Sequence, residues 1–257
     1  MVVFCFYRET AIGRSNNSVL ATCSLLTNLL LHVTMCILFT KEQTPAICVT
    51  RSALLYSFLV LQTTMILIKI QIPLKAFGSS LRATRSEINK NKTLIVVYVL
   101  LLALFNLALQ GVVFKMKGVP FIVERDNQNF KLNIWCDTSA NVNVSIPYLI
   151  MLYILCFIQA YRGRNLPGVY LEAMNVVWQS FVSIVEFGIM IPIFSFQKHG
   201  SDVVATEWLF ISIHTFTTIS ILHGKTVYVL LFRKDINNIE YVRTKTFSMM
   251  KKHVSKQ

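Results

Sequence analysis

Six stretches of this chain are each apolar enough, and nearly all long enough, to cross a lipid bilayer. A transmembrane helix needs about 20 predominantly apolar residues. Between the six stretches lie segments with Pro, Gly, Asn and charged residues, which interrupt helices. We therefore expect an all-α, polytopic membrane helix bundle over residues 19–232. Its six predicted spans are Val19–Phe39, Ser52–Leu74, Thr93–Phe114, Ile146–Tyr161, Val176–Phe196 and Glu207–Phe232.

The composition supports a membrane protein and argues against a nucleic-acid partner. Hydrophobic residues make up 54% of the 257 residues and charged residues only 14%, a surplus that a water-soluble core cannot use. The net charge of +13 is compatible with nucleic-acid binding. However, the basic residues lie between apolar runs rather than on one soluble face. We expect lipid around the spans and no bound nucleic acid.

The distribution of Lys and Arg predicts the orientation, because cytoplasmic loops carry an excess of both. With a cytoplasmic N-terminus, segments 1–18, 69–92, 162–172 and 233–257 lie inside and hold 17 basic residues against 5 acidic ones. The outside segments hold 7 basic residues against 6 acidic ones. We expect a cytoplasmic segment at 1–18, a basic cytoplasmic tail at 233–257 and a location in the plasma membrane. The outside basic residues are Lys41, Arg51, Lys115, Lys117, Arg125, Lys131 and Lys198.

Two of the six cysteines are candidates for a disulfide. Cys48 and Cys136 lie in polar loops on the predicted outer side, which is the oxidising compartment. The alternative is two unpaired loop cysteines. The other four lie in or beside apolar stretches, where free cysteine behaves as a small hydrophobic residue.

No set of residues in the sequence predicts catalysis. There is no Ser/His/Asp set, no P-loop, no GxGxxG and no C-x-x-C spacing, so we expect no enzyme activity, no cofactor and no metal site. His214 and His223 are nine residues apart in one span, which favours polar packing over metal binding. The sequon Asn143-Val144-Ser145 nearly abuts the fourth span, which favours an unused site.

Glu186 is unusual because it lies near the middle of the fifth span. A charged side chain at the bilayer centre costs about 2.5–3.5 kcal/mol on insertion scales and usually faces the interior of the bundle. The sequence leaves three alternatives open for this carboxyl group. It is neutral, it pairs with Lys225 or His214 on the next helix, or it lines a polar cavity.

Several short motifs occur in the same order as in one receptor family. The segment Arg164–Pro167, reading RNLP, precedes Tyr170–Met174, reading YLEAM. The first segment with a family counterpart is Phe6–Ile12, reading FYRETAI, and the last is Ile239–Arg243, reading IEYVR. Cys48 and Lys69 are 21 positions apart. Together these features resemble the seven-helix domain of class C G-protein-coupled receptors, especially the calcium-sensing and vomeronasal type-2 pheromone receptor branch.

The resemblance implies a role for particular residues. The six spans would be family helices 2–7, without helix 1 and the extracellular ligand domain, and Cys48–Cys136 would match the family disulfide. Lys69 and Glu172 would form a cytoplasmic ionic lock; independent interfacial charges are the alternative. The helix-6 switch region would be Glu186, Phe187 (where the family has Trp) and Pro192. The G-protein-facing loop residues would be Lys75, Arg82, Arg85, Arg162 and Arg164, which positive-inside topology explains equally well.

The function implied by the resemblance is signal transduction through G-protein coupling by cytoplasmic loops 2 and 3. The protein would be a truncated or divergent receptor of the chemosensory or calcium-sensing type. Its partners would be a heterotrimeric G protein and, in a homo- or heterodimer, other class C receptors. The alternative function is a non-signalling receptor-like subunit or decoy that associates with full-length receptors.

Overall fold

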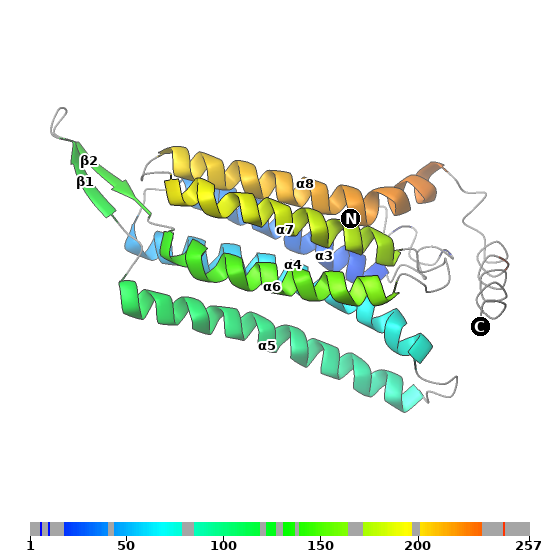
Figure 1. The fold of residues 1–257 in the computed structure, drawn as a ribbon. Helices are drawn as coiled ribbons and strands as arrows, with labels where there is room; N and C mark the ends of the chain where they lie inside the picture. Colours follow the sequence, from blue (N-terminus) through cyan, green and yellow to red (C-terminus); the bar gives the residue numbers. More distant parts are fainter. Residues whose placement is uncertain are drawn as a thin grey trace.

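The computed structural model contains six long helices that lie side by side in one bundle (Figure 1). It describes residues 18–40, 44–78, 85–118, 122–126, 131–136, 139–163, 172–196 and 201–232, together with residues 6, 10 and 244; the side chains at several helix ends are not described. The helices are α3 (Ser18–Thr40), α4 (Pro45–Gly78), α5 (Arg85–Lys117), α6 (Ser139–Gly163), α7 (Glu172–Phe196) and α8 (Ser201–Phe232).

All six helices are long and apolar enough to span a membrane, which confirms the predicted helical membrane bundle. Each helix contains one of the predicted spans, but most helices begin or end several residues beyond the apolar run. One such difference is at α4, which begins at Pro45, seven residues before the predicted span at Ser52. Arg51, which we had assigned to an outer loop, is therefore inside a helix.

Local chemistry explains why α4 begins early. Thr44 precedes the helix, and its Oγ1 accepts a hydrogen bond from the Ile47 N–H at 3.3 Å, as an N-cap residue does. Pro45 follows at the first helical position, where a missing N–H costs nothing. The carbonyl of Thr44 also accepts the Cys48 N–H at 3.0 Å. A polar loop sequence can thus start a helix before the apolar residues begin.

A β-hairpin lies in the connection between α5 and α6 and extends beyond one end of the bundle (Figure 1). Strand β1 (Ile122–Asp126) pairs antiparallel with β2 (Lys131–Trp135). Its ladder pairs Ile122 with Trp135 at the bundle side and Asp126 with Lys131 at the far side. The sequence did not predict this hairpin, because two five-residue strands give a weak pattern beside spans of 20 residues.

The bundle packs around α4, which contacts α3, α5, α6 and α7. Helix α5 lies at one edge of the bundle and packs against α4 and α6 (Figure 1). The largest apolar cluster is built mainly from α4, α6 and α7 and includes Tyr56, Leu149, Tyr153 and Phe187. Large apolar side chains also cover the outer surfaces of the helices, as expected where lipid is the solvent.

Candidate functional site: polar groups inside the helix bundle

Buried polar side chains occur at several levels along the bundle, between apolar layers. We call the end of the bundle that carries Cys48 the disulfide end, and the end that carries Lys69 the lysine end. In a membrane, a buried polar group without a hydrogen-bond partner costs free energy, so each such group is a candidate functional residue.

The disulfide joins Cys48 in the first turn of α4 to Cys136, the residue after strand β2. The Cα atoms of the two cysteines are 5.3 Å apart, and both side chains are buried. The pair is the one that the sequence had indicated. It fixes the end of the hairpin to the start of α4, and 88 positions separate the two cysteines in the chain.

One turn along α4 from the disulfide, Arg51 forms an ion pair with Glu207 of α8. The two side chains are 2% and 1% exposed, so this is a fully buried pair. The Arg51 Nη2 atom donates a hydrogen bond to Oε2 of Glu207. Burial of two charges is favourable only when each compensates the other. The pair therefore holds α4 and α8 in one register at the disulfide end.

The sequence did not predict this pair. It predicts Arg51 as an outer-loop cation and Glu207 as the first residue of the sixth span. A span predicted from apolar residues ends at charged residues, so it leaves them at or beyond the end of the helix. Arg51 follows Cys48 by three residues, almost one helical turn, and this spacing is the signal that could have indicated a position inside the helix.

Near the middle of the bundle, His214 of α8 contacts side chains of three helices. Its Nδ1 is 2.7 Å from Oε2 of Glu186 on α7, and its Nε2 is 3.1 Å from the hydroxyl of Tyr153 on α6. With the proton on Nδ1, the ring donates to the carboxylate and accepts from the tyrosine, so both nitrogens are satisfied. Of the alternatives left open for Glu186, the structure contains the pairing with His214.

Aromatic rings enclose the His214 imidazole. The centroid of Phe187 lies 5.1 Å from it, and Phe210 stacks on it with an interplanar angle of 4°. Phe187 also stacks on Tyr153 at 5.7 Å. The predicted switch residues Glu186 and Phe187 are thus adjacent to one buried histidine, whereas Pro192, the third member, is an exposed residue further along α7. We call Tyr153, Glu186, Phe187, Phe210 and His214 the histidine cluster.

A second link between α7 and α8 lies closer to the lysine end. The Nε2 of Gln179 donates to Oγ1 of Thr218 on α8 at 2.7 Å and to Oγ of Ser183 at 2.9 Å. All three side chains are buried. Interhelical hydrogen bonds in membranes contribute about 0.6 kcal/mol on average, so these bonds define a register more than they add stability.

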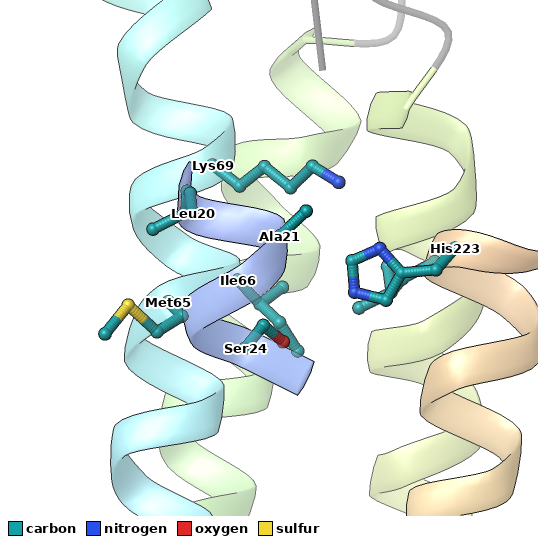
Figure 2. Close-up of a pocket in the computed structure, with 8 residues that line it drawn as sticks. Leu20, Ala21, Ser24, Met65, Ile66, Lys69 and His223 are labelled. Carbon is teal, nitrogen blue, oxygen red and sulfur yellow. The ribbon is translucent and has the colours of Figure 1, made fainter. Parts of the chain in front are cut away.

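At the lysine end, Lys69 of α4 is partly buried and lines a small pocket between α3, α4 and α8. Figure 2 shows its side chain extending toward the space that the His223 ring of α8 also faces. The predicted partner, Glu172, is the first residue of α7, but its side chain lies outside the described residues. The Lys69–Glu172 lock therefore stays a prediction.

The predicted G-protein-facing residues are described only in part. Arg162 is exposed in the last turn of α6. Lys75 belongs to α4 and Arg85 to α5, but the structure does not describe the side chain of either residue. Arg82 and Arg164 fall outside the described residues altogether.

The geometry defines a polytopic helical membrane protein with buried polar links between helices, and the comparisons with known proteins identify the family. Residues 1–225 match the family model described as the 7 transmembrane sweet-taste receptor of 3 GCPR. The chain belongs to this family, the seven-transmembrane domain of class C G-protein-coupled receptors. The calcium-sensing and vomeronasal resemblance seen in the sequence is confirmed by individual relatives.

Three relatives illustrate the similarity. The chain is 26% identical over 135 residues to the G-protein coupled receptor family C group 6 member A of Carassius auratus, which covers 52% of this chain and 15% of the relative. It is 29% identical over 101 residues to the extracellular calcium-sensing receptor of Mus musculus, and the match covers 39% of this chain and 9% of the relative. It is 31% identical over 108 residues to vomeronasal type-2 receptor 116 of Mus musculus, and this match covers 42% of this chain and 12% of the relative. The matched part is thus a small fraction of each relative.

Proposed function

We propose that this chain transduces a signal across the plasma membrane by coupling to a heterotrimeric G protein through its loops at the lysine end. The observation that carries the proposal is the separation of Cys48 and Lys69 on one helix. Their 21-residue spacing corresponds to about 31 Å along α4, close to the roughly 30 Å thickness of the bilayer core. This spacing supports a disulfide at the outer face and Lys69 at the cytoplasmic face.

The connection between α6 and α7 belongs to the same face in this proposal. Helix α6 runs parallel to α4, since Cys156 donates from its Sγ to the carbonyl of Thr63 at 3.7 Å and the disulfide joins the other ends. Helix α6 therefore ends, and α7 begins at Glu172, on the Lys69 side. This topology, together with family membership, supports Glu172 as the partner of the Lys69 ammonium.

In the resting state, the Lys69–Glu172 pair would hold the cytoplasmic ends of α4 and α7 together. Separation of the two charges would accompany activation, as in other electrostatic switches with two states. The links from α7 to α8 support a coupled movement: Glu186 contacts His214, and Gln179 contacts Thr218. A displacement of α7 must therefore either break these bonds or carry α8 with it.

The basic residues Lys75, Arg82, Arg85, Arg162 and Arg164 would face the G protein in this proposal. Both termini would be cytoplasmic, which agrees with the excess of basic residues in these segments. Contacts with anionic lipid headgroups explain the same residues, so charge alone does not separate the two roles. Association with another class C receptor, as a homo- or heterodimer, would bring in a second bundle.

The test is basal G-protein activation in cells that express the chain. We expect Glu172→Ala and Lys69→Ala to raise the basal signal by about fivefold, the change in population for roughly 1 kcal/mol. The exchanged pair Lys69→Glu with Glu172→Lys should return the signal to the level of the unchanged chain. The matched control is Lys117→Ala at the other end of the bundle, measured at equal surface expression.

A chain with no basal signal, whose single and exchanged variants are silent too, would contradict coupling. The alternative, a non-signalling subunit or decoy, would then be examined by co-expression with a full-length class C receptor. In that case the chain should lower or redirect the signal of the partner without producing its own.

A further inference from the structure

The two ring nitrogens of His214 connect α8 to two other helices. Helix α7 packs against both α6 and α8 (Figure 1). The Nδ1 atom of His214 is 2.7 Å from Oε2 of Glu186 on α7, and its Nε2 atom is 3.1 Å from the Tyr153 hydroxyl on α6. The His214 side chain is 0% exposed, whereas that of Glu186 is 14% exposed. The imidazole is therefore fully buried, next to a carboxylate that is not completely enclosed.

The Tyr153 hydroxyl has further hydrogen-bonding side chains beside it. Thr63 on α4 and Ser183 on α7 both act on this hydroxyl through side-chain hydrogen bonds. The Thr63 hydroxyl donates to the carbonyl of Leu59 at 2.8 Å, so its oxygen can still accept. The Ser183 oxygen accepts from Nε2 of Gln179 at 2.9 Å and has a second lone pair. The Tyr153 hydroxyl can therefore donate its proton to α8, to α4 or to α7.

These contacts allow two complete hydrogen-bond patterns. With one ring proton, on Nδ1, His214 donates to Glu186 and accepts from Tyr153. With a second ring proton, on Nε2, both nitrogens donate, and the Tyr153 oxygen must accept. The Tyr153 hydroxyl then donates its own proton to Thr63 or Ser183. The ring nitrogens and the phenol group have partners in both patterns.

The Glu186 carboxylate makes a charged imidazole compatible with burial. Protonation of an isolated buried histidine creates an uncompensated charge, which costs free energy. In this cluster, the same proton changes the ring and the carboxylate together from one net negative charge to none. Buried charges are tolerated when they form such compensated pairs. A second ring proton on His214 therefore leaves a neutral pair inside the bundle.

The other charged groups described near α8 lie farther from the His214 ring. Along α8, Glu207 is about 10 Å and His223 about 13 Å away at 1.5 Å per residue. Glu207 pairs with Arg51 of α4. On α3, the His32 ring contacts a backbone carbonyl of its own helix at 3.1 Å. The further titratable side chains on these helices include neutral Tyr56 and Cys156 and, toward the lysine end, the cations Lys69, Arg162 and Lys225.

We propose that His214 binds a second ring proton reversibly, with Glu186 as its counter-ion, and that this proton reverses the hydrogen bond with Tyr153. In one state the Tyr153 hydroxyl donates to α8. In the other state it donates to Thr63 of α4 or Ser183 of α7. Histidine is the side chain that ordinarily changes its charge between pH 5 and pH 8. The histidine cluster is thus a pH-sensitive switch between helices, and it is tested without a G protein.

The experiment follows the ring nitrogen-15 chemical shifts of the purified chain in detergent, labelled at histidine, from pH 8 to pH 5. These shifts distinguish protonated from unprotonated ring nitrogens. We expect Nδ1 of His214 to be protonated throughout and Nε2 to become protonated as the pH falls. The His214 signal is the one that His214→Gln lacks or, if that variant does not fold, the one that both Glu186→Gln and Tyr153→Phe change. The absence of such a signal, or an Nε2 atom that stays unprotonated at pH 5, would overturn the proposal.

A matched pair of variants tests the counter-ion. In Glu186→Gln the protonated ring has no compensating carboxylate. Its Nε2 atom should therefore take up the proton at a pH about 1–3 units lower, the usual effect of a neighbouring opposite charge. The control Glu124→Gln removes a carboxylate from strand β1 and should leave the titration of His214 unchanged. The same titration in Glu186→Gln as in the unchanged chain would rule out Glu186 as the counter-ion.

A second pair of variants tests the reversal of the hydrogen bond. Thr63→Val with Ser183→Ala removes both side-chain acceptors for the Tyr153 hydroxyl proton. The protonated pattern then lacks one hydrogen bond, so proton uptake should weaken about tenfold, which is about one pH unit. The control Thr64→Val with Ser180→Ala alters the same two helices, at a hydroxyl that donates to a carbonyl of α4 and at a buried serine of α7. Equal titrations of the two double variants would contradict the reversal.

Discussion

Arg51 of α4 and Glu207 of α8 form an ion pair that is almost completely buried, with side chains 2% and 1% exposed. Removal of one partner leaves an uncompensated charge in the bundle. We expect Arg51→Met to lower the free energy of unfolding by about 3–5 kcal/mol. Measurement by SDS or thermal unfolding in detergent would show the change, and Lys117→Met, which removes an exposed cation, should have little effect.

The double variant Arg51→Met with Glu207→Leu gives the complementary result. Replacement of a buried ion pair by apolar residues of similar size is often neutral, so most of the lost stability should return. A double variant that is as unstable as the sum of the two single variants would show that the two charges do not act as a pair.

Glu186 should contribute to the stability of the bundle by accepting a hydrogen bond from His214. Glu186→Gln keeps an acceptor oxygen for the Nδ1–H group, so its free energy of unfolding should change by less than about 1 kcal/mol. Glu186→Leu leaves this buried group without a partner and should cost about 1–3 kcal/mol. Thermal unfolding of both variants separates the two effects. Equal destabilisation by Gln and Leu would indicate that the negative charge, and not the acceptor, is what His214 requires.

The disulfide should stabilise the disulfide end by linking the hairpin to α4. Reduction, or the paired variant Cys48→Ser with Cys136→Ser, should lower the free energy of unfolding by about 2–4 kcal/mol. Thiol labelling of the denatured chain, before and after reduction, should reveal two additional reactive cysteines. Cys156→Ser, which alters a free buried cysteine, should leave that difference at two. An unchanged thiol count on reduction would contradict the disulfide.

Glycosylation tests the proposed orientation. Asn143 is exposed on α6, but Ser145 of its sequon is 1% exposed and lies within the helix, so we expect no glycan at Asn143. The change Asn129→Thr creates an acceptor sequon at Asn127, between β1 and β2. An outer hairpin predicts a gel shift that a glycosidase reverses for this variant alone. A shift at the natural sequon of Asn91, on the predicted inner side, would contradict the orientation.

The bundle could be predicted from the sequence because the apolar runs alone match the thickness of a membrane. The candidate disulfide could be predicted as well, since Cys48 and Cys136 are the cysteines outside the apolar runs. Both inferences depend on local composition and on which side of the membrane a loop lies. Neither requires knowledge of which faces of the helices meet.

The polar contacts inside the bundle could not be predicted in the same way. The choice between His214 and Lys225 as partner of Glu186 depends on helix rotation, and one residue of rotation turns a side chain by about 100°. The contact of Tyr153 with His214 joins residues 61 positions apart on helices that are not consecutive. The spacing of apolar residues within each helix does not predict such a contact. The Arg51–Glu207 pair was not predicted because a predicted span ends at charged residues, which are then expected near the membrane surface and not inside the bundle.

The position of Arg51 one turn after Cys48 has a mechanical consequence. The hairpin is attached to α4 through the Cys48–Cys136 bond, and the next turn of α4 is attached to α8 through Arg51 and Glu207. Strand β2, α4 and α8 are therefore connected in series within about one helical turn of α4. A force applied to the hairpin would therefore act on both α4 and α8, which are far apart in the sequence. It would be transmitted to α4 through the disulfide and from α4 to α8 through the ion pair.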